Sequence, residues 1–262
     1  MSIPFNDAAL KHAPWSMSKA AVALSCPFRH RLKYVQKVKG KEAAASSASR
    51  IGIAAHEALE WVLKGKHDLK EALRRTAIKT MLTTPEMDEV FALTHNLQLF
   101  LERLEKFKKK HAVSEQRVEL KFGLTPEFEQ VPFFDKSGQL FFRGVWDLCL
   151  RAHGKYLIIV DHKSGQVKDI AEYREQLDMY ALAGLHVFPD VEGVQSAIHH
   201  MQDDTGLHWE KKMRSADTIR DEVLPWFVGH LNNAGMSAEQ DNAKKGRWCS
   251  FCEYTEMCPL KT

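Results

Sequence analysis

Two aspartates and a lysine carry the strongest chemical signal in this sequence. Asp147 and Asp161 each lie seven residues from Gly154, and His153-Gly154-Lys155 is typical of a turn between two strands. In a hairpin centred there, the two carboxylates are cross-strand neighbours on one face of a sheet, with Cβ atoms within about 5.5 Å of each other. Lys163 follows Asp161 by two residues, so strand alternation sends its side chain to the same face.

Two carboxylates placed so closely repel each other unless a cation binds them. Hard oxygen ligands of this kind suit Mg²⁺ or Mn²⁺, and an ammonium group beside them can position a water molecule or stabilise charge on a phosphate. A D-x-K triplet is common by chance, and an aspartate at a strand end is usually a turn former. Here, however, the apolar run 157–160 before Asp161 and the turn residues Ser164-Gly165 after Lys163 place the triplet at the end of a buried strand.

The elements that position these residues change character near residue 114. Up to about residue 111, apolar residues recur at the three- and four-residue spacing of helices, with segments beginning near Ser16, Gly52, Asp68 and Pro85. Beyond this point the sequence predicts strands over 116–122, 139–150, 156–161, 194–201 and 207–213, and a helix over 171–186. We expect loops over 39–50 and 235–247, and a last helix from about 215 to 232 that Pro225 bends or ends early.

This order of elements predicts an α/β or α+β fold, with a central mixed sheet that contains an antiparallel hairpin and is flanked by helices. A hydrophobic content of 44% is enough for a sizeable core, so general disorder is excluded. We expect a single domain over 1–262, with a helical part at 14–111, a core at 112–214 and a C-terminal helix with a cysteine cluster at 215–262. No apolar run is long enough to span a membrane and the N-terminus lacks a signal-peptide core, so we expect a cytoplasmic protein without a membrane partner.

The C-terminal cysteines form a second constellation. Cys249, Cys252 and Cys258 supply three thiolates, one short of the four that a tetrahedral zinc or a cubane iron–sulfur cluster requires. Cys149, two residues after Asp147, is more consistent with a small buried apolar residue than with a ligand. The spacing alone leaves zinc and iron–sulfur both open.

Four motifs, in this order, resemble the RecB-like branch of the PD-(D/E)XK nuclease superfamily. The branch has the patterns G-x-x-x-H-x-x-L-E, G-x-x-D, D-x-K-[ST]-G and Q-x-x-x-Y. In this sequence they correspond to Gly52–Glu60, Gly144–Asp147, Asp161–Gly165 and Gln176–Tyr180. Order and spacing agree over roughly residues 16 to 260, and four ordered motifs are far more specific than any one of them.

The resemblance implies a restriction-endonuclease-like core and a Mg²⁺- or Mn²⁺-dependent DNA exonuclease that hydrolyses phosphodiester bonds. Its substrate would be single-stranded DNA or DNA ends, in recombination, repair, replication or CRISPR-type processing. The implied metal ligands are His56, Asp147, Asp161 and the main-chain carbonyl of His162, and the implied catalytic lysine is Lys163.

The remaining motif residues have less definite roles. Gln176 and Tyr180 project from one helical face, where they would bind the DNA backbone or orient the catalytic lysine. Glu60 could hydrogen-bond His56 from outside the metal site or be a surface charge, and Glu119 is the weakest candidate for the metal face. Considered singly, His56 and Tyr180 would more often be packing residues and Gln176 a solvated one.

The resemblance also bears on the cysteines. In iron–sulfur nucleases of this branch one cysteine precedes the core and three follow it, which Cys26 together with Cys249, Cys252 and Cys258 reproduces. A 4Fe-4S cluster is therefore favoured over zinc. Such a cluster would join the two ends of the chain and have a structural rather than a redox role.

The net charge of +3 is too small to identify a nucleic-acid binder, but basic residues are locally dense. The groups around Arg29–Lys41 and Lys244–Arg247 flank the proposed cluster cysteines and could follow a phosphate backbone. Aromatic residues in the same segments, which could stack on unpaired bases, are Phe28, Tyr34, Trp248 and Phe251. Two alternatives remain: a non-catalytic DNA-binding or adaptor protein that retains the fold, and a zinc-stabilised interaction module with an accidental D-x-K.

Overall fold

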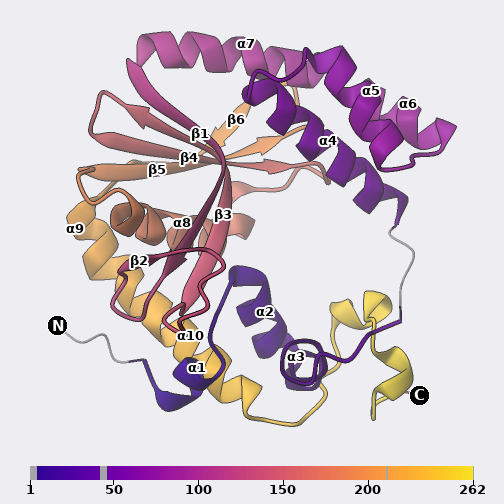
Figure 1. Ribbon diagram of the computed structural model, residues 1–262, viewed down its shortest axis with the longest axis vertical. Coiled ribbons are helices and arrows are strands. Elements are labelled where there is room, and N and C mark those ends of the chain that lie inside the picture. Colours follow the sequence, from indigo (N-terminus) through magenta and orange to yellow (C-terminus); the bar gives the residue numbers. More distant parts are fainter. Residues whose placement is uncertain (1–4, 42–45, 211, 262) are drawn as a thin grey trace. The chain divides into compact units, whose positions relative to one another are not determined.

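The computed structural model of the chain describes residues 5–41, 46–210 and 212–261 (Figure 1). The chain divides into two units, which we describe separately. Unit 1 holds residues 1–44, 121–144 and 220–262, and unit 2 holds residues 45–120 and 145–219. The single domain predicted over 1–262 stays a prediction.

Unit 2 is built on a β-sheet. Its strands are β1 (Val113–Leu124), β3 (Phe142–Ala152), β4 (Tyr156–Lys163), β5 (Gly193–His200), β6 (Leu207–Trp209) and β7 (Arg214–Ser215), of which β1 and β3 continue into unit 1. The strand order is β1-β3-β4-β5-β6, and β7 also pairs with β5. The pairs β3–β4 and β5–β6 are antiparallel, whereas β4–β5 is parallel. The sheet is therefore mixed, as predicted.

The hairpin of β3 and β4 is centred on Gly154, as the sequence predicted. Leu148 lies opposite Val160, and the same register continued by one residue pairs Asp147 with Asp161. His153 and Gly154 form the turn with φ values of 50° and 72°, a left-handed conformation that favours glycine. The hairpin register thus brings the two carboxylates together.

Helices cover both faces of the sheet in unit 2 (Figure 1). The helices α4 (Ser47–Leu63), α5 (Leu69–Lys79), α6 (Thr84–Ala92) and α7 (Thr94–Lys110) form one apolar core with Leu148, Leu150, Ile158 and Val160 of the sheet. On the other face, α8 (Arg174–Val187) approaches so closely that a Cβ on Gly184 would lie 2.8 Å from Leu157. Strand β4 is therefore buried on both faces, which explains its unbroken apolar run.

The parallel pairing of β4 with β5 places a third strand beside the D-x-K motif. The crossover between them contains the 3₁₀ turn η2 (Ile170–Tyr173) and α8. The register sets His162 against His199 and Lys163 against His200. Two histidines from β5 thus lie next to the end of β4.

Unit 1 contains the helices of both chain ends. These are α1 (Asp7–Lys11), α2 (Met17–Ser25), α3 (Pro27–His30), the π-helical turn η1 (Arg31–Val35) and α10 (Leu224–Ala238), with the short strand β2 (Gln130–Val131) paired to the end of β1. Helix α10 packs against α1 and α2, and Ser237 Oγ donates a hydrogen bond to the carbonyl of Ala23 over 2.7 Å.

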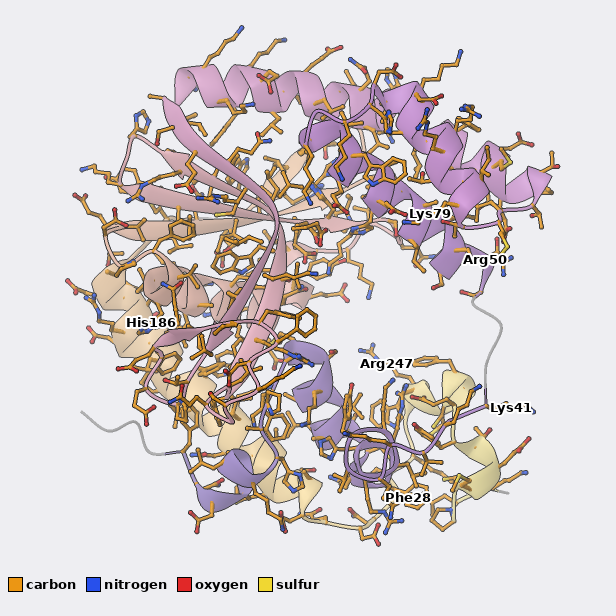
Figure 2. The ribbon with its side chains drawn as sticks, in the orientation of Figure 1. Phe28, Lys41, Arg50, Lys79, His186 and Arg247 are labelled. Atoms are coloured by element: carbon orange, nitrogen blue, oxygen red, sulfur yellow. The ribbon has the colours of Figure 1, made fainter. Side chains whose placement is uncertain are left out.

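The C-terminal segment contacts the N-terminal helices within unit 1, where Glu253 pairs with Arg29 and Lys33; Figure 2 labels Arg247 in this segment and Phe28 in α3. This segment contains the 3₁₀ turns η4 (Arg247–Phe251) and η5 (Thr255–Met257). The main-chain N–H of Lys41 donates to the carbonyl of Glu253 over 2.8 Å, and the Tyr254 hydroxyl donates to the carbonyl of Val38 over 3.0 Å. The two ends of the chain are thus joined by protein contacts.

Several predicted boundaries were wrong. The helix expected from Pro85 to residue 110 divides at Leu93, and Ser47–Arg50 begin α4 where a loop was expected. Residues 42–45 of that loop, and Lys211 of the strand predicted at 207–213, lie outside the described residues. The latter strand ends at Trp209.

The last helix also differs from the prediction. Pro225 neither ends nor interrupts it, because the proline lies in the first turn of α10, where its missing N–H has no helical partner to lose. The short helix α9 (Ala216–Thr218) and the π-helical turn η3 (Ile219–Val223) precede it. Helix α10 then continues to Ala238, so the loop expected from Gly235 begins later. No helix of the described chain has the length and apolar character needed to cross a membrane.

Candidate active site

The two carboxylates of the β3–β4 hairpin form the centre of the site in unit 2. Asp161 is buried, and Asp147 Oδ2 accepts a hydrogen bond from the main-chain N–H of His162 over 2.7 Å. Burial, reinforced by the charge of Asp161, raises the pKa of Asp147 to about 8. The protein thus holds a pair of carboxyl groups whose simultaneous ionisation requires additional positive charge.

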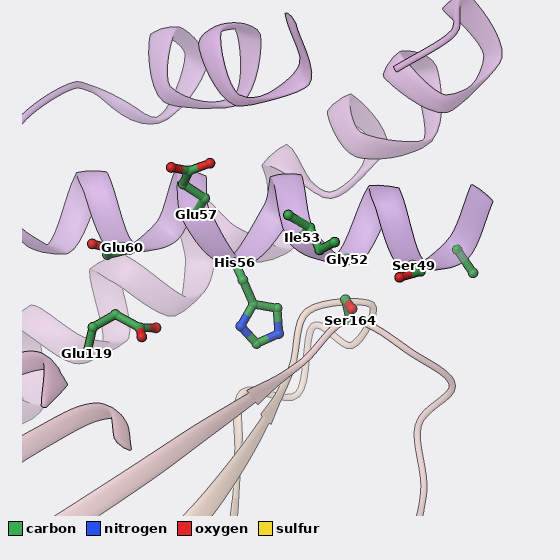
Figure 3. A pocket seen from close by; sticks show the side chains of 9 residues that line it. Ser49, Gly52, Ile53, His56, Glu57, Glu60, Glu119 and Ser164 are labelled. Carbon is green, nitrogen blue, oxygen red and sulfur yellow. The ribbon is translucent and has the colours of Figure 1, made fainter. Parts of the chain in front are cut away.

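Helix α4 brings His56 to this pair. Its Nδ1 lies 3.8 Å from Asp147 Oδ2, and Figure 3 shows the imidazole pointing from α4 into the space between Glu119 and Ser164. Burial lowers the pKa of His56, so the ring is neutral near pH 7 and has a lone pair available for a cation.

The close approach of α4 to the strand end depends on a glycine. A Cβ on Gly52 would lie 2.6 Å from Ser164 Oγ, well inside van der Waals contact. Gly52 precedes His56 by one helical turn, and Ser164 directly follows Lys163. The glycine of the first motif therefore sets how closely the helix can bring His56 to the D-x-K strand.

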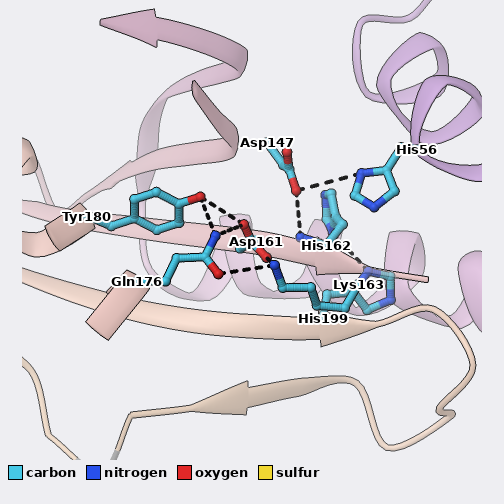
Figure 4. Close-up of polar contacts among 8 residues, drawn as sticks. All are labelled: His56, Asp147, Asp161, His162, Lys163, Gln176, Tyr180 and His199. Atoms are coloured by element: carbon cyan, nitrogen blue, oxygen red, sulfur yellow. Dashed lines mark hydrogen bonds and ion pairs between the residues drawn. The ribbon is translucent and has the colours of Figure 1, made fainter. Parts of the chain in front are cut away.

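A hydrogen-bond network connects Asp161 and Lys163 to α8 (Figure 4). Lys163 Nζ lies 2.6 Å from Asp161 Oδ2 and donates to Gln176 Oε1 over 3.1 Å. The amide of Gln176 donates to Asp161 Oδ1 over 2.8 Å, and the Tyr180 hydroxyl donates to the same oxygen over 2.9 Å. Gln176 thus contacts both the carboxylate of Asp161 and the ammonium of Lys163.

Tyr180 and Gln176 also contact each other, with 2.7 Å between the amide nitrogen and the hydroxyl oxygen. Burial, together with the charges of Asp161 and Asp147, raises the pKa of Tyr180 well above its usual value. Its hydroxyl therefore keeps its proton and serves as a donor to Asp161.

His162 of β4 and His199 of β5 form a second layer. They lie on the face of the sheet opposite to the side chains of Asp161 and Lys163. His162 Nδ1 lies 2.9 Å from His199 Nδ1, so one ring donates and the other accepts. Phe100 of α7 stacks on His199, with ring centroids 3.9 Å apart. Burial lowers the pKa of both imidazoles, to about 3 for His199, so the pair is neutral. The contact with His199 therefore fixes the side chain of His162, which lies between Asp161 and Lys163 in the sequence.

Sequence reasoning did not find His199 or Tyr173. The ring centroid of Tyr173 lies 5.3 Å from Lys163 Nζ, a cation–π distance. The adjacent histidines at the end of the predicted strand 194–201 were an available signal for His199. No sequence signal singled out Tyr173.

A pocket of about 510 Å³ opens beside this network in unit 2. Its lining includes His56, Glu60, Glu119 and Ser164. Glu119 occupies a left-handed position in β1, with φ at 55°, and its charge contributes to the raised pKa of Asp147. Glu119, the weakest candidate from the sequence, thus lies close enough to Asp147 to affect its pKa. Glu60 instead pairs with Lys64 over 2.6 Å.

The side chains around Asp147 include oxygen and nitrogen donors for a divalent cation. Within residues 5–41, 46–210 and 212–261, no three His, Cys, Asp or Glu side chains are grouped as a metal site. The donor types nevertheless suit a hard cation, since His56 Nδ1 lies 3.8 Å from Asp147 Oδ2 and the hairpin register places Asp161 opposite Asp147. Burial and the charge of Asp161 raise the pKa of Asp147, so its ionised form would gain from a nearby cation, while Asp161 already pairs with the ammonium of Lys163.

The cysteines predicted to bind a cluster lie in unit 1. Cys26 is buried at the end of α2, whereas Cys249 is exposed. Burial raises the pKa of Cys252, and its neighbour Glu253 pairs over 2.7 Å with Arg29, three residues after Cys26. Cys149 of unit 2 is buried, and burial raises its pKa to about 12, as a packing role predicts.

The basic residues beside Cys26 are largely engaged by the C-terminal segment. Glu253 pairs with Arg29 over 2.7 Å and with Lys33 over 2.9 Å, and Arg31 pairs with Asp241. These side chains hold unit 1 together, which leaves less of their charge for a phosphate backbone than the sequence suggested.

Comparisons with known proteins identify the family. The profile of the PD-(D/E)XK nuclease superfamily matches residues 14–259. A candidate exonuclease from Eubacterium rectale has a similar structure, with a TM-score of 0.51 and 11% identity over 97% of this chain and 92% of its own. The protein SSO0001 is 14% identical over 94% of this chain and 96% of its own, with a TM-score of 0.37. No curated protein matched significantly. With the predicted mixed sheet and hairpin in place, the chain belongs to the PD-(D/E)XK nuclease superfamily.

Proposed function

We propose that this protein is a metal-dependent deoxyribonuclease that acts as an exonuclease on single-stranded DNA or DNA ends. The observation that carries the proposal is the network of Asp147, Asp161, Lys163 and Gln176, in which the buried carboxylate of Asp161 pairs with the ammonium of Lys163 beside the half-buried carboxyl of Asp147. Burying ionisable groups in this way costs free energy, which a catalytic role would account for.

Nucleases of this superfamily generally use divalent metals such as Mg²⁺ or Mn²⁺. We propose His56, Asp147, Asp161 and the carbonyl of His162 as the ligands, with Glu119 close by. A bound divalent cation would acidify water and neutralise charge on the scissile phosphate.

The chain's own residues have complementary tasks. Lys163 orients the attacking oxygen and stabilises negative charge as the phosphate becomes pentacovalent. Gln176 and Tyr180 fix the orientation of the Asp161 carboxylate, because both donate a hydrogen bond to its Oδ1. The His162–His199 pair fixes the strand between the two motif residues. Together these contacts hold the reacting groups in place before substrate arrives.

The test is degradation of end-labelled DNA with Mn²⁺ present. We expect linear single strands to be shortened progressively from one end and circular single strands to survive. Equal cleavage of the circular substrate would show an endonuclease, and binding without any cleavage would favour the non-catalytic DNA-binding alternative.

We also propose that Cys26, Cys249, Cys252 and Cys258 bind a 4Fe-4S cluster. The support is that all four cysteines lie in unit 1, where the segments bearing Cys26 and Cys252 are joined by the Arg29–Glu253 ion pair. Protein purified without oxygen should be brown and lose its colour on oxidation. A colourless protein that contains zinc would instead support the zinc alternative.

A further inference from the structure

Two phenylalanines and two cations form a surface cluster in unit 1, which we call the aromatic platform; Phe134 and Lys121 are exposed, and the other two are half-buried. Its residues are Lys121 of β1, Phe133 and Phe134 of the loop after β2, and Arg143 of β3. The two rings meet edge to face with centroids 4.8 Å apart. Lys121 Nζ lies 5.8 Å from both ring centroids, and Arg143 Cζ lies 5.0 Å from that of Phe133.

The platform exposes a large apolar ring. Phe134 is 68% exposed, so most of its surface is open to a ligand. A single exposed apolar residue needs no explanation. Two adjacent phenyl rings with a cation beside each form an unusual surface, because cations and rings together suit a ligand with both an aromatic part and negative charge.

The charge of the platform is not neutralised by the protein. Among the described residues, neither Lys121 nor Arg143 forms an ion pair with a carboxylate, in contrast to Arg29 and Lys33 near the cysteines. The acidic residue of the same loop, Asp135, instead accepts hydrogen bonds from Ser137 Oγ over 2.8 Å and from the N–H of Gln139 over 3.2 Å. Positive charge therefore remains available beside the rings.

Arg143 is held in position. Its Nη1 donates to the carbonyl of Phe133 over 3.4 Å, which links β3 to the loop that carries the rings. This contact restrains the loop and leaves other donors of the guanidinium free for an anion. The platform thus combines the open ring of Phe134 with a guanidinium, that of Arg143, whose position is restrained.

We propose that the aromatic platform binds an unpaired segment of a DNA strand, with a base stacked on Phe134 and the adjoining phosphates contacted by Lys121 and Arg143. Base stacking on aromatic side chains tolerates any sequence, whereas a paired base hides its faces in the duplex. The inference rests on the proposed nuclease function, because it gives the DNA substrate a subsite in unit 1.

The test is the affinity of the full-length protein for fluorescein-labelled oligothymidylate of about 15 nucleotides, measured by anisotropy in EDTA so that cleavage does not interfere. Phe134→Ala should weaken binding about five- to tenfold, and Phe134→Trp should restore it. Lys121→Gln should lower the slope of log Kd against log salt by about 0.7. Lys136→Gln, which removes an equal charge from the same loop, is the matched control and should change neither quantity.

The outcomes separate this inference from the proposed function. Unchanged affinity in Phe134→Ala, or equal losses in Lys121→Gln and Lys136→Gln, would overturn the platform even if the protein cleaves DNA. A wild-type protein that cleaves nothing, but loses single-strand affinity selectively in Phe134→Ala, would overturn the nuclease proposal and support the platform. Failure of the wild-type protein to bind the oligonucleotide would overturn the platform as well.

Discussion

Substituting Gly52 with alanine tests how the site is assembled. The new Cβ would lie 2.6 Å from Ser164 Oγ and 3.6 Å from Ser164 Cβ, so only the hydroxyl oxygen conflicts with it. To reach an ordinary contact of 3.4 Å, the oxygen and α4 must separate by about 0.8 Å (3.4 − 2.6). His56 lies one helical turn further along and would move with the helix.

The expected effect on stability is small, while that on activity is large. Alanine stabilises a helix by about 1 kcal/mol relative to glycine, and overpacking costs about 1–3 kcal/mol, so the free energy of unfolding should fall by no more than about 2 kcal/mol. A misplacement near 1 Å can cost about 10²-fold in rate. We therefore expect Gly52→Ala to cleave DNA about 10- to 100-fold more slowly while remaining folded.

The assay compares single-turnover cleavage and thermal unfolding of four proteins: wild type, Gly52→Ala, Ser164→Ala and the double variant. Ser164→Ala removes the conflicting oxygen, so the double variant should recover most of the activity of Ser164→Ala alone. Full activity in Gly52→Ala, or no recovery in the double variant while Ser164→Ala is active, would refute this reasoning.

Three further predictions concern other parts of the protein. Gln176→Leu removes the hydrogen bonds to Asp161 and Lys163. Because each hydrogen bond to a charged group contributes about 1.5–3 kcal/mol, single-turnover cleavage should slow about 10- to 100-fold. An unchanged rate would contradict the positioning role of Gln176. Burial, aided by nearby cationic groups, lowers the pKa of His30 to about 4. The unfolded chain therefore binds the extra proton as pH falls from about 6.5 to 4, and the free energy of unfolding should drop by about 3 kcal/mol. Urea unfolding should show a loss over this pH range that is about 3 kcal/mol smaller in His30→Phe than in the wild type, because the other buried histidines contribute equally to both. Cys258→Ser should abolish the visible absorption of protein purified without oxygen, and an unaltered spectrum would exclude this cysteine as a cluster ligand.

The parts of the site that depend on local periodicity could be predicted from the sequence. The turn at Gly154 and the two-residue period of the strands placed Asp147, Asp161 and Lys163 on one face, which the hairpin register confirms. The four-residue spacing of Gln176 and Tyr180 likewise placed both on one side of α8, where they meet Asp161. These relations follow from backbone geometry within neighbouring elements.

Relations between distant segments could not be predicted in the same way. The contact of His162 with His199 depends on the parallel register of β4 and β5, which a crossover of many residues leaves undetermined. The approach of Gly52 to Ser164 depends on how α4 packs on the sheet. The basic residues near Cys26 suggested a DNA-binding surface because their partner, Glu253, lies more than 200 residues away in the sequence.

Cleavage of labelled single-stranded DNA with Mn²⁺ by wild-type, Lys163→Ala and Asp161→Ala proteins tests the central claim most directly. Both substitutions remove a side chain at the centre of the network, and matching circular dichroism spectra would show that the variants are folded. We predict that the wild type degrades the substrate and that each variant is slower by about 10²-fold or more. Full activity in either folded variant would contradict the assignment of this site.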